Sequence, residues 1–152
     1  MVGNYGHTPH FNFEAYTTGD LRVYWNNGEK DLLFFNFDMR DNKWHYVGFI
    51  RNYNVDTIKI YIDGLDNNFT TAGTNLDLQW PLRIGGDFAA SPVRIPFNGL
   101  IDDVRIYNQA ISTSEIQNNY FIGINKLLKD QGITLNEFNQ RLVELKNNIA
   151  KQ

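Results

Sequence analysis

Apolar and polar residues alternate in short segments along most of the chain between residues 10 and 108. In segment 10–17, for example, Phe11, Phe13 and Ala15 alternate with their neighbours. A repeat of two residues places side chains on opposite faces of an extended backbone, so each segment is typical of a β-strand. The strands expected from this pattern cover residues 10–17, 20–26, 32–37, 43–52, 58–64 and 81–86.

Turn residues separate these strands. Asn and Gly, which tolerate positive φ angles, occur in the turns at 18–20 and 26–28. Short strands at this spacing, with turn signals between them, predict a two-sheet sandwich rather than a parallel sheet. Residues 65–79 are polar and predict a long loop that has room for one weak strand.

A turn followed by a strand is predicted at residues 96–107, PFNGLIDDVRIY. Asp102, Val104 and Ile106 share one face of this strand, and the two apolar residues indicate that it faces the core. A buried carboxylate needs a partner, because burying an unpaired charge is costly. We therefore expect Asp102 to accept backbone hydrogen bonds, or to bind a metal ion.

The pattern becomes helical after residue 107. Ser112 with Glu115, and Thr134 with Glu137, predict two capping boxes. In each, the Ser or Thr hydroxyl accepts the amide of the fourth residue, and the Glu side chain reaches back to the amide of the first. Three helices are expected. The first begins at Ser112, the second covers residues 122–131 and ends before a left-handed Gly132, and the third runs from Thr134 to about residue 150.

Five apolar residues of the last helix form one stripe. They are spaced 3, 4, 3 and 4 residues apart, as are the a and d positions of a coiled coil. Two heptads are too few for a coiled coil alone, since about three to four are needed. The stripe therefore either docks the helix on its own domain or on the preceding helix, or meets another chain. Its residues are Leu135, Phe138, Leu142, Leu145 and Ile149.

Composition and charge exclude several classes of protein. The chain of 152 residues has no cysteine, so no disulfide or thiolate metal site is expected. The net charge of −3 argues against a general nucleic-acid-binding protein, which needs a basic surface. The sequence contains no run of about 18 apolar residues, so no membrane span is expected. The first residues lack the basic and apolar segments of a secretion signal.

Four blocks of sequence, in this order and approximate spacing, resemble the bacterial laminin-G-like domain, a concanavalin A-like lectin/glucanase jelly roll. They are NKWHYVGFIRN (42–52), IKIYIDG (58–64), PLRIGG (81–86) and FNGLIDDVRIYNQAISTSEI (97–116). The resemblance implies an all-β fold, a two-sheet antiparallel jelly-roll sandwich, followed in this chain by C-terminal α-helices. We therefore expect two domains, a jelly-roll sandwich at 1–110 and a helical extension at 111–152.

The sequence departs from this family in two ways. The family's first strands, one of which carries a Trp, are absent, so we expect either a fragment or a compact variant whose open sheet edge a partner segment can complete. The helical tail from Ile122 onward is not required by the family. In relatives, an Asp matching Asp102 can bind a structural Ca²⁺ together with carbonyls of the first strands. No cofactor is required on this reading, and Ca²⁺ is one alternative for Asp102.

The residues do not favour catalysis. Glycoside hydrolases need two carboxylates about 5–5.5 Å or about 6.5–9.5 Å apart, and no predicted strand carries acidic residues at suitable positions. The three histidines are the only candidate bases, and His45 is expected to be a strand residue whose ring is satisfied. Glycan binding would use aromatic rings beside polar residues. The candidate ligand-binding residues, each of which is alternatively a packing residue, are Trp25, Tyr24, Trp80 and Tyr107.

These observations predict a non-enzymatic interaction module of a surface or virion assembly, acting in adhesion, glycan recognition or protein contact. Its partners would be a glycan or another protein chain, with a homo-oligomer or a larger assembly included. One alternative is a monomeric carbohydrate-binding lectin-like domain, and another is a glycoside hydrolase. The expected location is extracellular, at a cell surface or in a virion.

Overall fold

A computed structural model describes most of the chain. The chain forms two compact units. The first comprises residues 1–43 and 73–105, and the second comprises residues 44–72 and 106–152. Each unit has its own antiparallel sheet. The described residues are 2–3, 11–15, 21–25, 30–32, 37–70, 83–86 and 97–150.

The first unit holds a five-stranded sheet in the order β4-β3-β2-β1-β8. Its central pair confirms the strands predicted at 10–17 and 20–26, with Phe13 opposite Val23. Of the strand predicted at 81–86, residues 83–84 form β8, and residues 81–82 lie outside the described residues. Residues 33–36 of the strand predicted at 32–37 lie outside the described residues. The strands are β1 (Val2–Gly3), β2 (Phe11–Ala15), β3 (Leu21–Trp25), β4 (Lys30–Leu32) and β8 (Arg83–Ile84).

The second unit holds a three-stranded meander. It consists of β5 (Val47–Asn52), β6 (Thr57–Ile62) and β7 (Leu65–Thr70), in that order across the sheet. The first two strands are those predicted from alternation, whereas β7 is a complete strand in what was predicted to be mainly a loop. Asp63 and Gly64 join β6 to β7 with φ angles of 51° and 77°. Two left-handed residues form the tight hairpin turn that matches the twist of antiparallel strands, and this turn brings the polar segment into the sheet.

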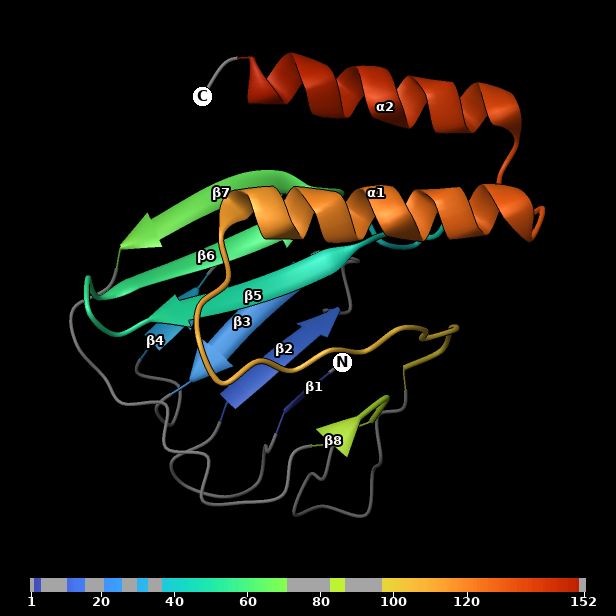
Figure 1. Cartoon of the computed structure of the whole chain (residues 1–152). Helices are drawn as coiled ribbons and strands as arrows, with labels where there is room; N and C mark the ends of the chain where they lie inside the picture. The colour runs from blue at the N-terminus through green and yellow to red at the C-terminus, as the bar shows by residue number, and fades with distance from the viewer. Residues whose placement is uncertain are drawn as a thin grey trace. The chain divides into compact units, whose positions relative to one another are not determined.

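Side chains on both faces of β6 are buried. Ile58, Ile60 and Ile62 alternate along one face, as predicted, and the first two are fully buried at 0% exposure. Tyr61 lies on the opposite face at 1% exposure and packs with Ile50 of β5 and with Ile116. This second face is the one that the first C-terminal helix covers (Figure 1).

The first C-terminal helix is α1 (Thr113–Lys129). The predicted capping box is confirmed, since Ser112 Oγ accepts a hydrogen bond from Glu115 N and Glu115 Oε2 accepts one from Ser112 N. The prediction of a separate helix at 122–131 is wrong, because α1 runs without a break from Thr113 to Lys129. The left-handed residue that follows is Gln131, at φ 59°, rather than Gly132, whose amide donates to Leu127 O.

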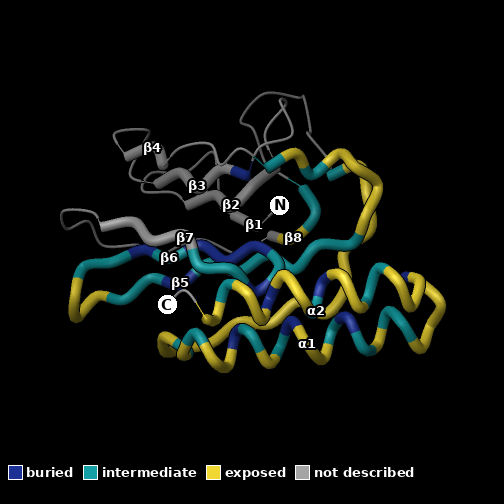
Figure 2. Tube along the Cα trace, turned by 90° about the horizontal axis from the view of Figure 1, so that it is seen from above, coloured by how far each residue is buried: buried dark blue, intermediate teal, exposed yellow. Residues whose placement is uncertain are grey.

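The second helix is α2 (Leu135–Ile149), capped by the side chain of Thr134. It lies alongside α1 in a helical hairpin, and buried residues recur along both helices between exposed ones (Figure 2). The middle of the predicted stripe faces α1: Leu145 is buried with Tyr120 and Ile124, and Phe138 and Leu142 pack against this cluster. Its ends, Leu135 at 62% and Ile149 at 47% exposure, do not. The described residues therefore place the stripe mainly in a contact between the two helices.

Residues 97–110 form neither helix nor strand, so the strand predicted at 96–107 is wrong over its described part (Figure 1). Every residue from 98 to 110 is exposed, with Val104 at 46% and Ile106 at 70%, so neither belongs to the core. Asp103 adopts φ 53°, which interrupts an extended backbone. Its carboxylate pairs with Arg105 two residues later, at 2.8 Å, so these charges are satisfied locally.

The chain thus combines two antiparallel sheets with two C-terminal helices. The face-to-face packing that a jelly-roll sandwich requires stays a prediction. The predicted domain boundary after residue 110 also stays a prediction, although the compact units divide the chain elsewhere. The reason for their division is that α1 buries Ile116 against Ile50 and Tyr61, which ties the helices to the second sheet.

Candidate functional site

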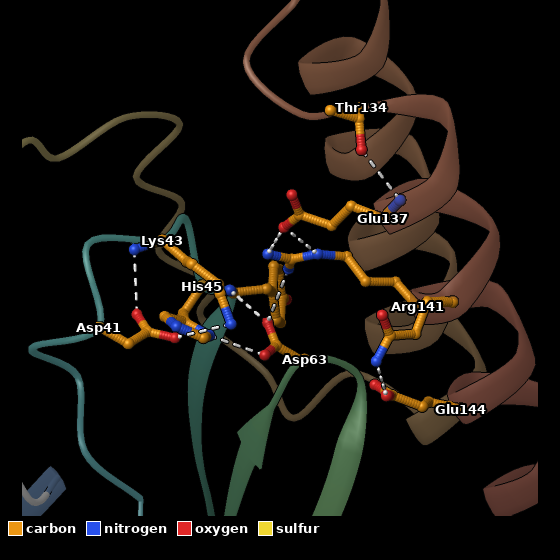
Figure 3. Close-up of polar contacts among 10 residues, drawn as sticks. Asp41, Lys43, His45, Asp63, Thr134, Glu137, Arg141 and Glu144 are labelled. Carbon is orange, nitrogen blue, oxygen red and sulfur yellow. Dashed lines mark hydrogen bonds and ion pairs between the residues drawn. The ribbon is translucent and has the colours of Figure 1, made fainter.

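A cluster of charged side chains surrounds the turn between β6 and β7 (Figure 3). Two hydrogen bonds between Asp63 and Tyr46 hold the turn. The Asp63 amide donates to Tyr46 O at 2.9 Å, and the Tyr46 amide donates to Asp63 Oδ1 at 3.0 Å. These two bonds hold the left-handed conformation of Asp63 and fix its carboxylate beside the start of β5.

The Asp63 carboxylate binds groups from two other parts of the second unit. Its Oδ2 lies 2.8 Å from Nδ1 of His45, whose side chain is only 9% exposed. Its Oδ1 lies 3.8 Å from Nη1 of Arg141, a buried residue of α2. The prediction that the His45 ring would be satisfied is confirmed, although His45 precedes β5 rather than lying in it.

Arg141 connects the turn to the start of α2. Its Nε and Nη2 donate to Glu137 Oε1 at 3.1 Å and 2.7 Å, one helical turn earlier. Burial lowers the pKa of Arg141, but hydrogen bonds to Glu137 and Tyr120 outweigh this effect and raise it overall. A single guanidinium therefore stays charged between two carboxylates, those of Asp63 and Glu137.

Tyr120 of α1 completes this network. Burial raises the pKa of Tyr120 to about 12, and the negative charge of Asp63 adds to the effect, while Arg141 opposes it. Its ring meets that of Tyr46 edge to face, with centroids 6.2 Å apart. We call Asp63, His45, Arg141, Glu137 and Tyr120 the Asp63 network. It joins the sheet, α1 and α2 by charge as well as by packing.

A second ion pair crosses the same sheet. Lys59 Nζ lies 2.9 Å from Oδ2 of Asp66, and this hydrogen bond raises the pKa of Lys59. Next to it, the Tyr61 hydroxyl lies 2.9 Å from Thr113 Oγ1 at the first residue of α1. The ion pair joins β6 to β7, and the Tyr61–Thr113 contact attaches the N-terminal end of α1 to the sheet.

The chemistry of the Asp63 network is that of a stabilising ion-pair cluster. A glycoside hydrolase needs one carboxylate as an acid and another as a base or nucleophile, both facing a groove. Here Arg141 lies between the two carboxylates and pairs with both, at 3.8 Å from Asp63 and 2.7 Å from Glu137. In the part of the chain that the structure describes, no group of three or more His, Cys, Asp or Glu could hold a metal ion. Sequence reasoning did not find this cluster, although the Asp-Gly turn and the Thr134 cap marked two of its elements.

The expected ligand-binding aromatic residues are only partly visible. Tyr24 and Trp25 belong to β3, whose side chains at these positions are not described, and Trp80 lies outside the described residues. Tyr107 is 47% exposed, and its hydroxyl accepts a hydrogen bond from Asn119 Nδ2 at 3.4 Å. Ligand binding by these four residues stays a prediction.

Asp102 is exposed, so the expectation that its carboxylate points into the core is wrong. Its Oδ1 accepts a hydrogen bond from the Asp103 amide at 2.8 Å. This bond corresponds to the expected acceptor role for backbone amides, at the surface instead of in the interior. Ca²⁺ needs about six to eight oxygen ligands. Because the described residues offer no cluster of acidic ligands at Asp102, a Ca²⁺ site there stays a prediction.

The stretch from residue 100 to residue 107, which we call the exposed segment, is unusually apolar for its exposure. It follows Phe97, whose amide donates to Gly85 O at 2.9 Å, so its start is tied to β8. The exposed apolar side chains are Leu100 at 77%, Ile101 at 42%, Val104 at 46%, Ile106 at 70% and Tyr107 at 47%. Large apolar side chains gathered at a surface commonly mark a binding site.

Two antiparallel sheets of short strands place the chain among β-rich domains, here with added helices. Residues 1–117 match the family described as the Concanavalin A-like lectin/glucanases superfamily, in its laminin G form. The chain therefore belongs to this superfamily, whose domains are β-sandwiches, and the resemblance read from the four sequence blocks is confirmed. Most of α1 and all of α2 lie beyond the matched residues.

One solved structure is similar to the chain: residues 221–444 of an S-layer domain-containing protein from Clostridium thermocellum ATCC 27405. The two share 22% sequence identity with a TM-score of 0.44, and the match covers 77% of this chain and 59% of that one. The chain thus spans less than two thirds of the protein it matches, and a score this low carries no functional argument. No curated protein matches the chain. Among the described helices, none is both long and apolar enough to cross a membrane.

Proposed function

We propose that this chain is a non-enzymatic interaction module that binds a glycan or another protein chain within a surface or virion assembly. The observation that carries the proposal is the exposed segment, in which five large apolar side chains stand at the surface. Folded monomers rarely expose contiguous apolar residues without a use for them, because exposure forfeits about 25 cal/mol for each Å² left in water.

Membership of the Concanavalin A-like superfamily supports a binding role. The Asp63 network agrees with a non-enzymatic module, because Asp63 and Glu137 both pair with Arg141 instead of facing each other across a groove. In the exposed segment, Asp103 is likewise paired with Arg105.

Glycan binding is the more specific alternative, and Tyr107 favours it. Its ring is half exposed and its hydroxyl is oriented by Asn119, so one apolar face and one polar tip are presented together. Sugars are recognised by this combination, because their C–H faces stack on rings while their hydroxyls need hydrogen bonds. Trp25 and Tyr24, in the first unit, remain proposed glycan-binding residues.

A glycan array with matched variants tests this proposal. Tyr107→Ala and Trp25→Ala are compared with Tyr53→Ala, which removes a tyrosine that is 53% exposed and bound to Arg51 instead. We expect glycan binding to fall for the first two variants and to persist for the third, with thermal melting confirming that all three fold. Release of reducing sugars from any array glycan would overturn the non-enzymatic assignment. An array without any binding would leave protein contact as the proposed role, which association measurements test separately.

A further inference from the structure

We propose that His45 is a pH-sensitive switch of the second unit: it takes up a proton in mildly acidic solution, and its charged ring then holds Asp63 and the turn after β6 more firmly. The inference concerns how the stability of this unit is regulated. It is independent of the proposed binding function, because every contact on which it depends lies in the Asp63 network.

The Asp63 network has two carboxylates but only one group that is always positively charged. Arg141 pairs with Glu137 at 2.7 Å and with Asp63 at 3.8 Å. The longer distance is the one to Asp63, so the charge of this carboxylate is the less completely compensated. His45 is the member of the network that can supply a second positive charge, because histidine changes its charge between about pH 5 and pH 8.

The His45 ring is placed to give this charge to Asp63. Its Nδ1 lies 2.8 Å from Asp63 Oδ2, whereas Arg141 approaches the other oxygen, Oδ1 (Figure 3). The two side chains are only 9% and 22% exposed, so water screens their contact little. A neutral ring with its proton on Nδ1 already donates a hydrogen bond here. A protonated ring donates the same bond with a full charge, which makes it stronger.

Two effects oppose protonation of the ring. Burial disfavours the charged form of His45, and the Arg141 guanidinium repels it. The contact with the Asp63 carboxylate at 2.8 Å acts against the first effect. The second effect is reduced because Nε and Nη2 of Arg141 both donate to Glu137, whose negative charge offsets that of the guanidinium.

The other ionisable groups around the network do not reverse this balance. Tyr120 of α1 stays neutral throughout the range, because burial raises its pKa to about 12. Glu144 of α2 adds a negative charge near Tyr120. Lys43, shortly before the switch in the sequence, pairs with Asp41 at 3.3 Å, so its charge is compensated locally. The charges therefore favour a protonated ring in the folded chain.

The turn passes the effect of protonation to the helical hairpin. Asp63 is followed by Gly64, where an added Cβ would lie 3.0 Å from both Tyr120 Cδ1 of α1 and Leu145 Cδ1 of α2. The turn thus lies against both helices, and a firmer hold on its carboxylate steadies the surface on which they pack. Because the folded chain then binds a proton more tightly than the unfolded chain, its stability should increase as the pH falls.

Urea unfolding of the full chain between pH 5.5 and pH 8 tests the switch. The folding equilibrium constant should rise about tenfold as the pH falls across this range, the effect of one added charge pair. His45→Asn keeps a hydrogen-bond donor in the place of Nδ1 but cannot ionise, and it should lose this rise. Asp63→Asn keeps the ring but removes the carboxylate, and it should lose the rise as well. His10→Asn removes another histidine as the matched control and should retain it.

Nitrogen NMR of the His45 ring gives a second measurement that needs no variant to fold. We expect a doubly protonated ring at pH 5.5, and a neutral ring with its proton on Nδ1 at pH 8. A ring that stays neutral down to pH 5.5 would overturn the proposal, and so would an unchanged pH dependence in His45→Asn. Stability that decreases on acidification in the original chain but not in His45→Asn would also overturn it, because burial and Arg141 would then outweigh Asp63.

Discussion

Arg141 on α2 lies 3.8 Å from Asp63 in the turn between β6 and β7, although the two residues are far apart in the sequence. The same guanidinium binds Glu137 within its own helix. This contact, together with the packing of Phe138, Leu142 and Leu145 against α1, attaches α2 to the rest of the second unit. The pair therefore offers a direct measure of how firmly the helical hairpin is held.

Arg141→Met should lower the free energy of unfolding by about 2 kcal/mol, because two partly buried carboxylates lose their common partner. The figure is lower than for a fully buried pair, since Asp63 and Glu137 keep 22% and 31% exposure. Methionine retains the apolar stem, so the change isolates the charge. Urea unfolding gives the value, with the exposed Lys146→Met as control. A double-mutant cycle with Asp63→Asn should show coupling, and strictly additive effects would contradict a direct interaction.

Two glycines of the second unit should respond in opposite directions to replacement by alanine. At Gly64, φ is +77° and a Cβ would stand 3.0 Å from both Leu145 Cδ1 and Tyr120 Cδ1. Gly64→Ala should therefore cost about 1–3 kcal/mol, from backbone strain and from crowding of the helix contact. Gly123 lies inside α1 with open space around it, so Gly123→Ala should gain about 0.5–1 kcal/mol. Denaturant midpoints measure both, and equal effects at the two sites would contradict this placement of the turn.

The fold was predictable from the sequence where local pattern and tertiary pairing agree. Ile58, Ile60 and Ile62 alternate and do lie on one face of β6. β7 was missed because its sequence, LDNNFT, carries little apolar signal, and its pairing is decided by the Asp63–Gly64 turn. The strand expected at residues 101–107 was wrong for the opposite reason. Its alternating pattern is strong, but no strand in the described structure pairs with it.

The candidate site was less predictable than the fold, for a related reason. A salt bridge such as that between Asp63 and Arg141 depends on how α2 returns to the sheet, and no local spacing encodes that return. The capping residue Thr134 fixed where α2 begins, but not which element it meets. Asp102 was expected to be buried because Val104 and Ile106 are apolar, and the inference failed with the strand on which it depended.

The stripe on α2 yields a prediction that separates its two proposed uses. Leu145 is 7% exposed in the contact between the helices, whereas Leu135 is 62% exposed. Leu145→Ala should cost about 2–4 kcal/mol of stability, because it opens a cavity among Tyr120, Ile124 and Ile133. Leu135→Ala should change stability by less than about 0.5 kcal/mol. Thermal or urea unfolding tests both, and a large loss of self-association in Leu135→Ala would show that the stripe instead meets another chain.

Tyr120 should make the stability of the chain fall at high pH. Burial raises its pKa from 10.0 to about 12, so the folded chain keeps a proton that the unfolded chain releases between these values. Since the folded state then binds more protons, the free energy of unfolding decreases as pH rises through this window. Tyr120→Phe cannot ionise, and it should lose this slope while also losing the hydrogen bond to Arg141 at lower pH. Lys59 and the other lysines titrate in the same range in both proteins, so the difference between the two unfolding curves, measured from pH 9 to pH 12, isolates Tyr120. Parallel curves across that range would show that the Tyr120 hydroxyl is not buried against α2.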